Sequence, residues 1–211
     1  MSEIEFPGDA EPPRGRSREA TRARLLDAAA AVFAEVGLGA ASVEAICERA
    51  GFTRGAFYSN FASKDELFLE LAITFDRQRA RMVQERVENL SEPVDPGNIR
   101  RIVEVLGRSD DDHFGVLLMT EITAHAMRDH RFAEALRREN EQIHAEVAEM
   151  VAAIASRGCL RLRATPEEIA TYILGAWVDS STRAVVAGLG PEEMLALRAR
   201  EVGRLVELLI E

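Results

Sequence analysis

SVEAICERAGFTRGAFYSNFASK, residues 42–64, predicts two short helices joined by a tight turn and followed by the start of a third helix. Ser42 is a residue that can cap a helix over Val43–Ala50, whose apolar side chains recur at helical spacing on one face. Gly51 follows directly, where a helix end favours glycine because the turn needs a positive φ. These features indicate a helix that stops sharply at residue 51.

The second half of the stretch repeats the same pattern of caps. Thr53 can cap a helix over Arg54–Ser59, and Ser63–Glu66 has the spacing of a capping box, which opens a long helix. Two helices joined by so short a glycine turn are typical of the helix-turn-helix, whose second helix enters the major groove of DNA. The sequence therefore predicts a DNA-binding head.

The run AICERAGFTRGAFYSNFASKDEL resembles the DNA-binding signature of TetR/AcrR-type transcriptional regulators. The matching residues are Ser42, Ile46, Ala50, Gly51, Gly55, Tyr58, Phe61, Lys64 and Leu67. The resemblance covers about Arg18–Leu71, and beyond it only length and helix layout match. Two positions depart from the pattern: Asn60, where the family often has histidine, and Glu44, where some members have a base-contacting cation. Both departures bear on the operator sequence and not on the fold.

The residues at the start of the second helix of the motif are the candidates for reading bases. These are Arg54, Gly55 and Ala56. The Arg54 guanidinium matches guanine O6 and N7, Gly55 lets the backbone approach a base, and Ala56 can touch a thymine methyl group. Taken singly, Arg54, Tyr58 and Lys64 would each more often be ordinary exposed residues; their spacing beside Ala50 and Gly51 favours the DNA interpretation.

Phosphate contacts follow from the resemblance and from helix geometry. The resemblance places Phe57 in the core of the head and Tyr58 against a phosphate, and it implies further phosphate contacts from Ser42, Thr53, Asn60 and Lys64. Helix N-termini offer unpaired backbone amides to phosphates, and Ser42, Thr53 and Lys64 lie at such ends.

Charge is unevenly distributed along the chain. The net charge is −10, yet residues 14–64 have eight basic and five acidic side chains, while residues 1–13 have four acidic and no basic ones. A basic segment on an acidic body suggests one focused anion-binding face. Residues 1–13 are expected to be a disordered acidic tail. Arg16 and Arg18 follow it in an arm that could contact DNA, the alternative being a solvated basic tail.

Several classes of protein are disfavoured. The N-terminal residues have no apolar core of the kind a signal peptide needs, and no run approaches the length of a membrane span, so we expect a cytoplasmic protein with no membrane partner. Cys47 and Cys159 make neither a disulfide framework nor a zinc motif, and no metal or cofactor is expected. The chain has no nucleophile elbow or phosphate-binding glycine loop, which argues against an enzyme.

The rest of the chain reads as helices without strand alternation, so the fold class is all-α with about nine helices. The expected domains are the tail over 1–13, a helix-turn-helix head over 14–63, and a helical ligand-binding and dimerisation domain over 64–211. The expected helices cover Arg18–Val36, Val43–Ala50, Arg54–Ser59, Lys64–Asn89, Asn98–Leu106, His113–Arg128, Arg131–Arg157, Pro166–Ala187 and Pro191–Leu209.

The last two helices are the candidate dimer seam. Small residues in one and leucines at heptad spacing in the other would allow close packing, either between two copies or within one chain. In the resembled family these helices pair with their symmetry mates as a four-helix bundle. The candidate seam residues are Gly175, Ala176, Ser180, Leu195, Val202, Leu205 and Leu209.

The resemblance also implies a pocket for an effector inside the second domain. Polar residues four apart, such as Glu121 with His125 and Asn140 with His144, could converge in an apolar cavity, although a surface or core role is the more common one for any single residue of this kind. The candidate lining residues are Phe75, Met82, Leu117, Met119, Glu121, His125, Asn140, His144, Tyr172 and Trp177.

The function that these patterns predict is a sequence-specific DNA-binding regulator. We expect a homodimeric repressor that binds a palindromic operator and is released by a small apolar effector. The alternatives are a ligand-independent regulator or an activator, or a helical interaction module whose DNA contacts are vestigial.

Overall fold

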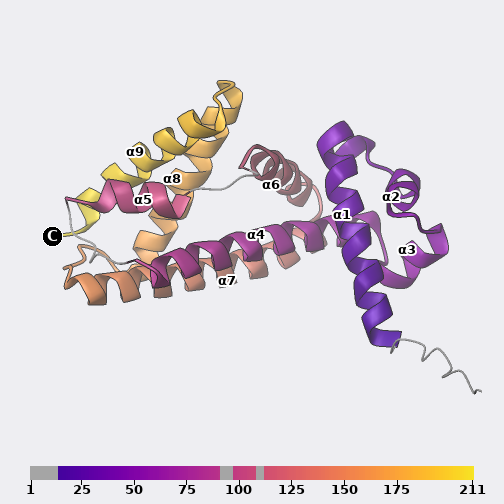
Figure 1. The fold of residues 1–211 in the computed structure, drawn as a ribbon, viewed down its shortest axis with the longest axis horizontal. Coiled ribbons are helices and arrows are strands. Elements are labelled where there is room, and N and C mark those ends of the chain that lie inside the picture. Colours follow the sequence, from indigo (N-terminus) through magenta and orange to yellow (C-terminus); the bar gives the residue numbers. More distant parts are fainter. Residues whose placement is uncertain (1–13, 91–96, 108–111) are drawn as a thin grey trace, which may run out of the picture. The chain divides into compact units, whose positions relative to one another are not determined.

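The computed structural model describes residues 14–90, 97–107 and 112–211, and these residues are almost entirely helical (Figure 1). The expected acidic tail over 1–13 lies outside the described residues. Within them the single β-type pairing is an isolated antiparallel bridge between Leu162 and Ile210, so the all-α prediction is confirmed. The described residues form nine helices: α1 (Arg14–Ala40), α2 (Val43–Ala50), α3 (Arg54–Asn60), α4 (Lys64–Glu88), α5 (Ile99–Gly107), α6 (Asp112–Ala126), α7 (His130–Gly158), α8 (Pro166–Val186) and α9 (Pro191–Leu209).

The helix ends agree closely with the sequence patterns, and the main difference is in α1. This helix begins at Arg14 and continues to Ala40, with a kink at Gly37, whose φ of 77° and ψ of 167° are not helical. The expected helix end at Gly37 is therefore a kink, after which the chain makes one further helical turn. Both α2 and α9 have the predicted bounds.

The chain divides into two compact units, one up to Leu71 and the other from Ala72 onward. The division falls inside α4, later than the boundary at residue 64 that the sequence suggested. The reason is that Leu67, Phe68 and Leu71, in the first two turns of α4, are buried in the core of the first unit.

The core of the first unit joins α1, the helix pair α2–α3 and the start of α4. Leu25 and Ile46 are fully buried, as is Phe57, which confirms that the Phe57 side chain of α3 points inward. The ring of Phe33 packs edge-on against that of Phe68 at 6.2 Å between centroids. This apolar packing gives the short helices α2 and α3 the stability that helices of their length lack alone.

Cations of the first unit bind the C-terminal ends of three of its helices. The last carbonyl groups of a helix have no partner within it, and cations interact favourably with that end. Arg24 Nη2 donates to Ala50 O at the end of α2 at 2.8 Å, Arg18 Nη2 to Ser59 O near the end of α3 at 3.1 Å, and Lys64 Nζ to Leu38 O and Ala41 O at the end of α1 at 3.2 and 3.1 Å. Much of the basic character of this unit therefore has a structural role.

The second unit packs α9 against both α5 and α8. Ile99 and Ile102 of α5 meet Val202 and Val206 of α9 in one buried cluster. Two glycines allow close contacts around this core. A Cβ atom on Gly107 would lie 2.9 Å from Trp177, and one on Gly115 would lie 2.4 Å from the ring of Phe75.

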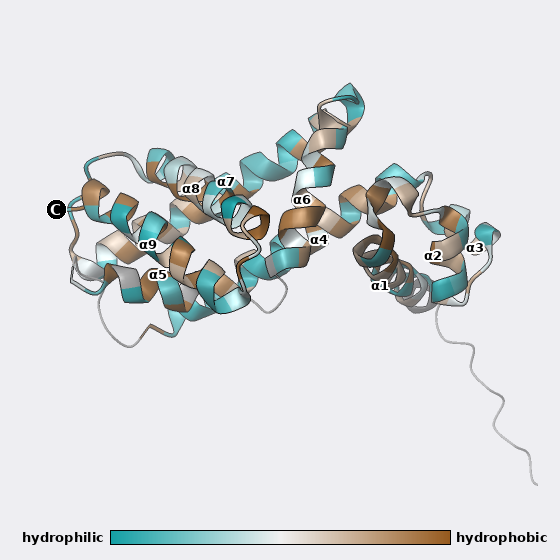
Figure 2. Cartoon of the chain, turned by 90° about the horizontal axis from the view of Figure 1, so that it is seen from above, coloured by the Kyte–Doolittle hydropathy of each residue, from teal (hydrophilic) through white to brown (hydrophobic). Residues whose placement is uncertain are grey.

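Hydrophobic and hydrophilic residues alternate along the helices (Figure 2). Among the described helices, none has the length and apolar character needed to cross a membrane.

Candidate nucleic-acid interface and effector cavities

The turn between α2 and α3 is fixed by its caps. The amide of Ala45 donates to Ser42 Oγ at 3.1 Å, and the amide of Ala56 donates to Thr53 Oγ1 at 3.2 Å. Gly51 adopts φ 72° and ψ 31°, the left-handed conformation that favours glycine. The three residues that the sequence assigned to caps and turn therefore form the helix-turn-helix geometry.

The start of α3 is presented to solvent while its other face is buried. Thr53, Arg54 and Gly55 are exposed and Ala56 is half-buried. Phe57 lies beneath them and is fully buried. The candidate base-reading residues thus lie together on the exposed start of a helix that the core holds in place.

Arg54 is held by two neighbours. Its Nη1 atom lies 2.7 Å from Glu44 Oε1, and its guanidinium carbon lies 5.9 Å from the centroid of the Tyr58 ring. The side-chain hydrogen bond with Tyr58 and the charge of Glu44 raise the pKa of Arg54 above its already high usual value, so the guanidinium stays charged. Tyr58 is half exposed and packs edge-on against Phe57, which leaves it accessible to a phosphate.

Two of the predicted phosphate contacts have partners inside the unit. Asn60 is buried, and its Nδ2 donates to Ala56 O at 2.8 Å, so its amide is directed into the helix. The Lys64 ammonium binds the end of α1, as described above. The hydroxyl oxygens of Ser42 and Thr53 accept from backbone amides, which leaves their hydroxyl hydrogens available to donate.

The predicted basic arm is helical. Arg16 and Arg18 lie in α1, which begins at Arg14, and not in an extended segment. The reason is that a continuous helix brings Arg18 over the end of α3, where it binds Ser59 O.

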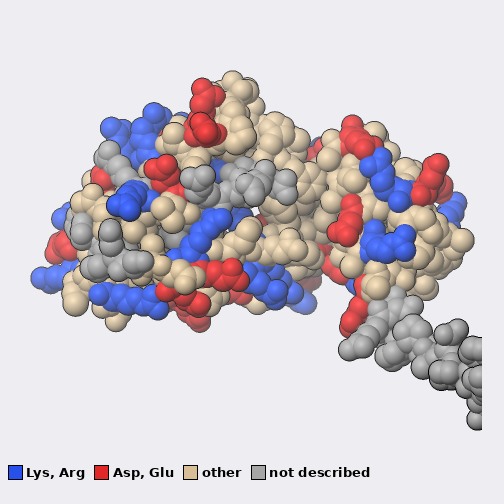
Figure 3. All heavy atoms as spheres, viewed as in Figure 1, with Lys and Arg blue, Asp and Glu red and all other residues tan. Residues whose placement is uncertain are grey.

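Acidic and basic side chains alternate on the visible face of the first unit, and no uniform basic patch is seen there (Figure 3). Arg22 forms a bidentate pair with Glu70, with Nε 2.6 Å from Oε1. Arg49 binds both carboxylate oxygens of Glu35 at 2.8 and 2.6 Å. Pairing of this kind disperses the focused positive charge that the sequence suggested.

Cys47 is buried on the inner face of α2 as a small core residue. Burial raises the pKa of its thiol, and the charge of Glu44 acts in the same direction while Arg54 opposes it. The thiol is therefore protonated at neutral pH and poorly reactive.

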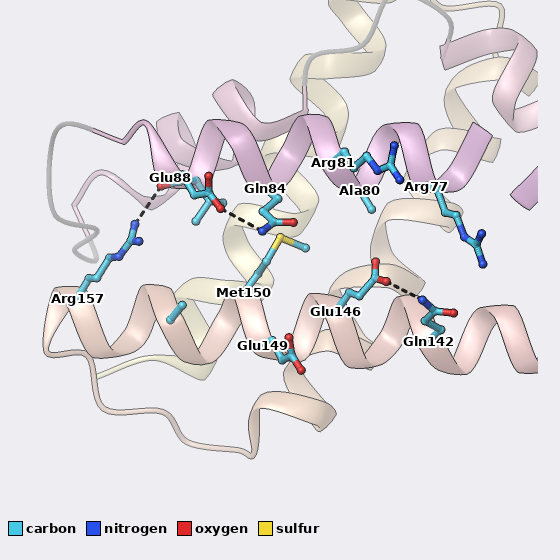
Figure 4. Close-up of a pocket in the computed structure, with 12 residues that line it drawn as sticks. Arg77, Ala80, Arg81, Gln84, Glu88, Gln142, Glu146, Glu149, Met150 and Arg157 are labelled. Carbon is cyan, nitrogen blue, oxygen red and sulfur yellow. Dashed lines mark hydrogen bonds between the residues drawn. The ribbon is translucent and has the colours of Figure 1, made fainter. Parts of the chain in front are cut away.

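A groove of about 560 Å³ lies between α4 and α7 in the second unit (Figure 4). Its walls are rich in charge: Arg77, Arg81 and Arg157 face it together with Glu88, Glu146 and Glu149. Some of these charged groups form hydrogen bonds with neighbours in the groove wall. Gln84 donates to Glu88 at 3.0 Å, and Arg157 donates to Val87 O at 3.3 Å. None of the predicted pocket residues lines this groove.

A second cavity of about 550 Å³ is formed by α6, α7 and α8. Alanines and Leu136 supply apolar wall, and Asn140, His144 and Thr171 supply neutral polar groups. The charged residues Arg137, Glu141 and Glu167 also line it. Asn140 and His144 were the pair predicted from their spacing on one helix face, and both line this cavity. Thr171 was not singled out, because a hydroxyl on an amphipathic helix has no distinctive sequence signal.

The other predicted pocket residues lie outside both cavities. Phe75 packs edge-on against Phe114. The guanidinium carbons of Arg79 and Arg198 lie 4.4 and 4.5 Å from the centroid of the Trp177 ring. The ring of His125 packs on that of Phe132, 4.7 Å away. Met82, Leu117 and Tyr172 are exposed, and Met119 and Glu121 are half-buried. Sequence spacing could not separate these roles, because core, cavity and surface residues share the same helical period.

The predicted seam residues fall into two groups. Ser180 and Val202 are buried within the single chain. Ala176, Leu195, Leu205 and Leu209 are half-buried, and Gly175 is exposed. A Cβ on Gly175 would meet no atom within 4 Å, so packing inside one chain does not require glycine there.

Comparisons with known proteins agree on both parts of the chain. Residues 25–71 match a family model described as bacterial regulatory proteins of the tetR family, and residues 98–207 match one described as the C-terminal part of BetI-type transcriptional repressors. The regulator UidR of Escherichia coli K12 is 31% identical over 134 residues, which are 63% of this chain and 63% of UidR. The match thus spans less than two thirds of the length of that relative.

The repressor KstR2 of Mycobacterium tuberculosis H37Rv is 50% identical over 50 residues, which are 24% of this chain and 25% of KstR2. Among solved structures, Salmonella enterica GusR has a TM-score of 0.62 at 26% identity, covering 89% of this chain and 96% of GusR. A TetR-family regulator from Mesorhizobium loti has a TM-score of 0.71 at 20% identity, covering 90% of this chain and 97% of that one, which supports the fold.

Proposed function

The chain belongs to the TetR family of bacterial transcriptional regulators, and on that premise we propose that it represses transcription as a homodimer on a palindromic operator. Relatives of this kind are regulators and not enzymes, in agreement with the sequence. The observation that carries the proposal is the exposed start of α3, where Arg54 stands on a helix anchored by the buried Phe57. Such a regulator acts on the genome, so we place it in the cytoplasm.

DNA contacts in this proposal fall into two classes. Arg54, Gly55 and Ala56 face base edges in the major groove, where a guanidinium pairs with guanine. Ser42, Thr53 and Tyr58 bind phosphates and fix the register of the helix on the duplex. Asn60 and Lys64 support this surface from within the unit.

We place the effector in the cavity formed by α6, α7 and α8. A volume of about 550 Å³ is in the range of small-molecule sites, and a mostly apolar wall with a few polar groups suits a small apolar molecule. Asn140 and His144 would orient it. The charged groove between α4 and α7 suits such a ligand less well.

Release from DNA then follows from linkage. A ligand shifts a conformational equilibrium only as far as it binds one state better than the other. The helix α4 is continuous from the core of the first unit into the second, where Arg77 Nε donates to Glu139 Oε1 of α7 at 2.9 Å. Because α7 supplies most of the cavity wall, α4 offers a connection through α7 between the effector cavity and the DNA-binding head. The proposal requires that operator and effector weaken each other's binding by the same factor.

The test is selection of bound duplexes from fragmented source genome by purified protein, with Arg54→Ala in parallel. We expect a palindromic site that the wild type enriches and the variant loses, with a loss of affinity of roughly 10- to 100-fold on that site and little change on random duplex. Genes beside the site would nominate the effector. Enrichment of nothing beyond salt-sensitive background would contradict the proposal and favour an interaction module.

A further inference from the structure

Glu44 and Arg54 form an ion pair that links the first turns of α2 and α3. Glu44 lies two residues after the cap Ser42, and Arg54 directly follows the cap Thr53. Their side chains approach to 2.7 Å between Oε1 and Nη1, and both are well exposed, at 58% and 61%. A carboxylate therefore stands beside the candidate base-reading guanidinium, on a surface that is proposed to approach phosphates.

This pair is not needed to hold the two helices together. Exposed ion pairs contribute little to stability, whereas Ile46 and Phe57, buried beneath the same helices, already join α2 and α3 to the core. The consequence of the contact is instead local, because it restricts where the guanidinium can point. Nη1 lies at Glu44 and the guanidinium also forms a hydrogen bond with Tyr58, which leaves further N–H donors of Arg54 for other partners.

We propose that Glu44 is a positioning residue that sets the base specificity of Arg54, an inference that rests on the DNA-binding function proposed above. Without Glu44, the long Arg54 side chain has an alternative partner in the nearest phosphate, and that contact is the same for every sequence. With Glu44, the guanidinium is held back from phosphates, and its remaining N–H donors pair with guanine O6 and N7.

The chain provides a matched control. Glu35 is likewise an exposed carboxylate of the first unit, and it binds Arg49, which has no proposed contact with bases. Glu35→Gln and Glu44→Gln remove the same charge from the same unit and each break an arginine pair. Only Glu44→Gln alters the partner of a base-reading residue.

The experiment measures dissociation constants of wild type, Glu44→Gln and Glu35→Gln on two duplexes. One is the selected operator, and the other carries an A·T pair in place of the G·C pair whose recognition is lost in Arg54→Ala. We expect Glu44→Gln to lower the discrimination ratio about fivefold or more, chiefly by binding the substituted duplex more tightly. We expect Glu35→Gln to leave the ratio unchanged, and thermal unfolding to show all three proteins folded.

A double-mutant cycle tests whether the effect passes through Arg54. In the Arg54→Ala background, Glu44→Gln should leave the ratio unaltered. Two outcomes would overturn the role of Glu44 and leave the DNA-binding function standing. One is a Glu44→Gln protein that discriminates as well as the wild type, and the other is an equal loss of discrimination with and without Arg54. Absence of discrimination by the wild type would instead overturn the DNA-binding function itself.

Discussion

At the scale of single residues, cations of the first unit that look alike in sequence have different roles. Arg18, Arg24 and Lys64 donate to carbonyls at helix ends, whereas Arg54 points to solvent beside Glu44. The difference arises from tertiary contacts with segments far away in the chain. Sequence alone therefore predicted a base-reading role for Arg54 from its place after the cap, but it could not foresee that Lys64 binds the end of α1.

Replacement of Lys64 tests whether this cation has a structural role or contacts a phosphate. We expect Lys64→Met to lower the free energy of unfolding by about 1–3 kcal/mol, because the carbonyls of Leu38 and Ala41 lose their donor. The slope of operator affinity against salt should stay the same, since no phosphate contact is removed. Urea unfolding and salt titrations measure the two quantities. A slope reduced by about one with stability unchanged would make Lys64 a phosphate contact instead.

Asp76 is a second residue whose role the sequence did not reveal. Removal of this carboxyl from water raises its pKa to about 6, with Glu139 acting in the same direction and Arg79 opposing. A raised pKa means that the folded state binds the proton more tightly than the unfolded state does. Stability from this group is thus fully present below about pH 4 and is lost as pH rises through about 6.

Replacing Asp76 by asparagine removes this titration. We expect Asp76→Asn to be more stable than the wild type at pH 7.5, by on the order of 1–2 kcal/mol after allowance for partial solvent access, and equal to it near pH 4. Urea unfolding at the two pH values measures the difference. Asp65→Asn, at an exposed position of the same helix, serves as control, and an equal effect from it would refute the assignment.

At the scale of helices, local signals predicted most of the fold. The caps Ser42, Thr53 and Thr165 and the turn glycine Gly51 all adopt the conformations that their residue types favour. The start of α1 was missed because its first residues contain Gly15 and no apolar stripe, while a tertiary contact from Arg18 supports the helix there. Local chemistry thus fixes helix ends well except where a distant contact extends a helix.

The capping box of α8 allows a direct test at this scale. The amide of Glu168 donates to Thr165 Oγ1 at 3.2 Å, and the amide of Thr165 donates to Glu168 Oε2 at 2.9 Å. We expect Thr165→Ala to lower the free energy of unfolding by about 1 kcal/mol. Thr120→Ala in α6, at an exposed position whose hydroxyl donates back to Val116 O, should change it much less. Equal effects of the two changes would show that the box contributes nothing.

At the scale of the whole molecule, assembly depends on which faces of α8 and α9 remain uncovered in one chain. Val202 is buried in the internal cluster with Ile99 and Ile102. At Val202, the heptad spacing of α9 therefore reflects packing within one chain and not a dimer seam. Gly175, Val178, Thr182 and Val186 recur three or four residues apart along α8 and are all exposed. Sequence spacing could not distinguish these faces, because both are apolar with the same period.

The proposed dimer therefore makes its sharpest prediction at Val178, which is 63% exposed at the centre of this face of α8. We expect Val178→Asp to be monomeric at micromolar concentration where the wild type is dimeric, because a charge buried in an apolar seam lacks a partner. Light scattering after gel filtration measures the state. Met127→Asp, at an 82% exposed position at the end of α6, should remain dimeric. Operator affinity should fall when the dimer is lost, since one head alone binds half of a palindrome. A Val178→Asp protein that remains dimeric would show that the seam lies on another face.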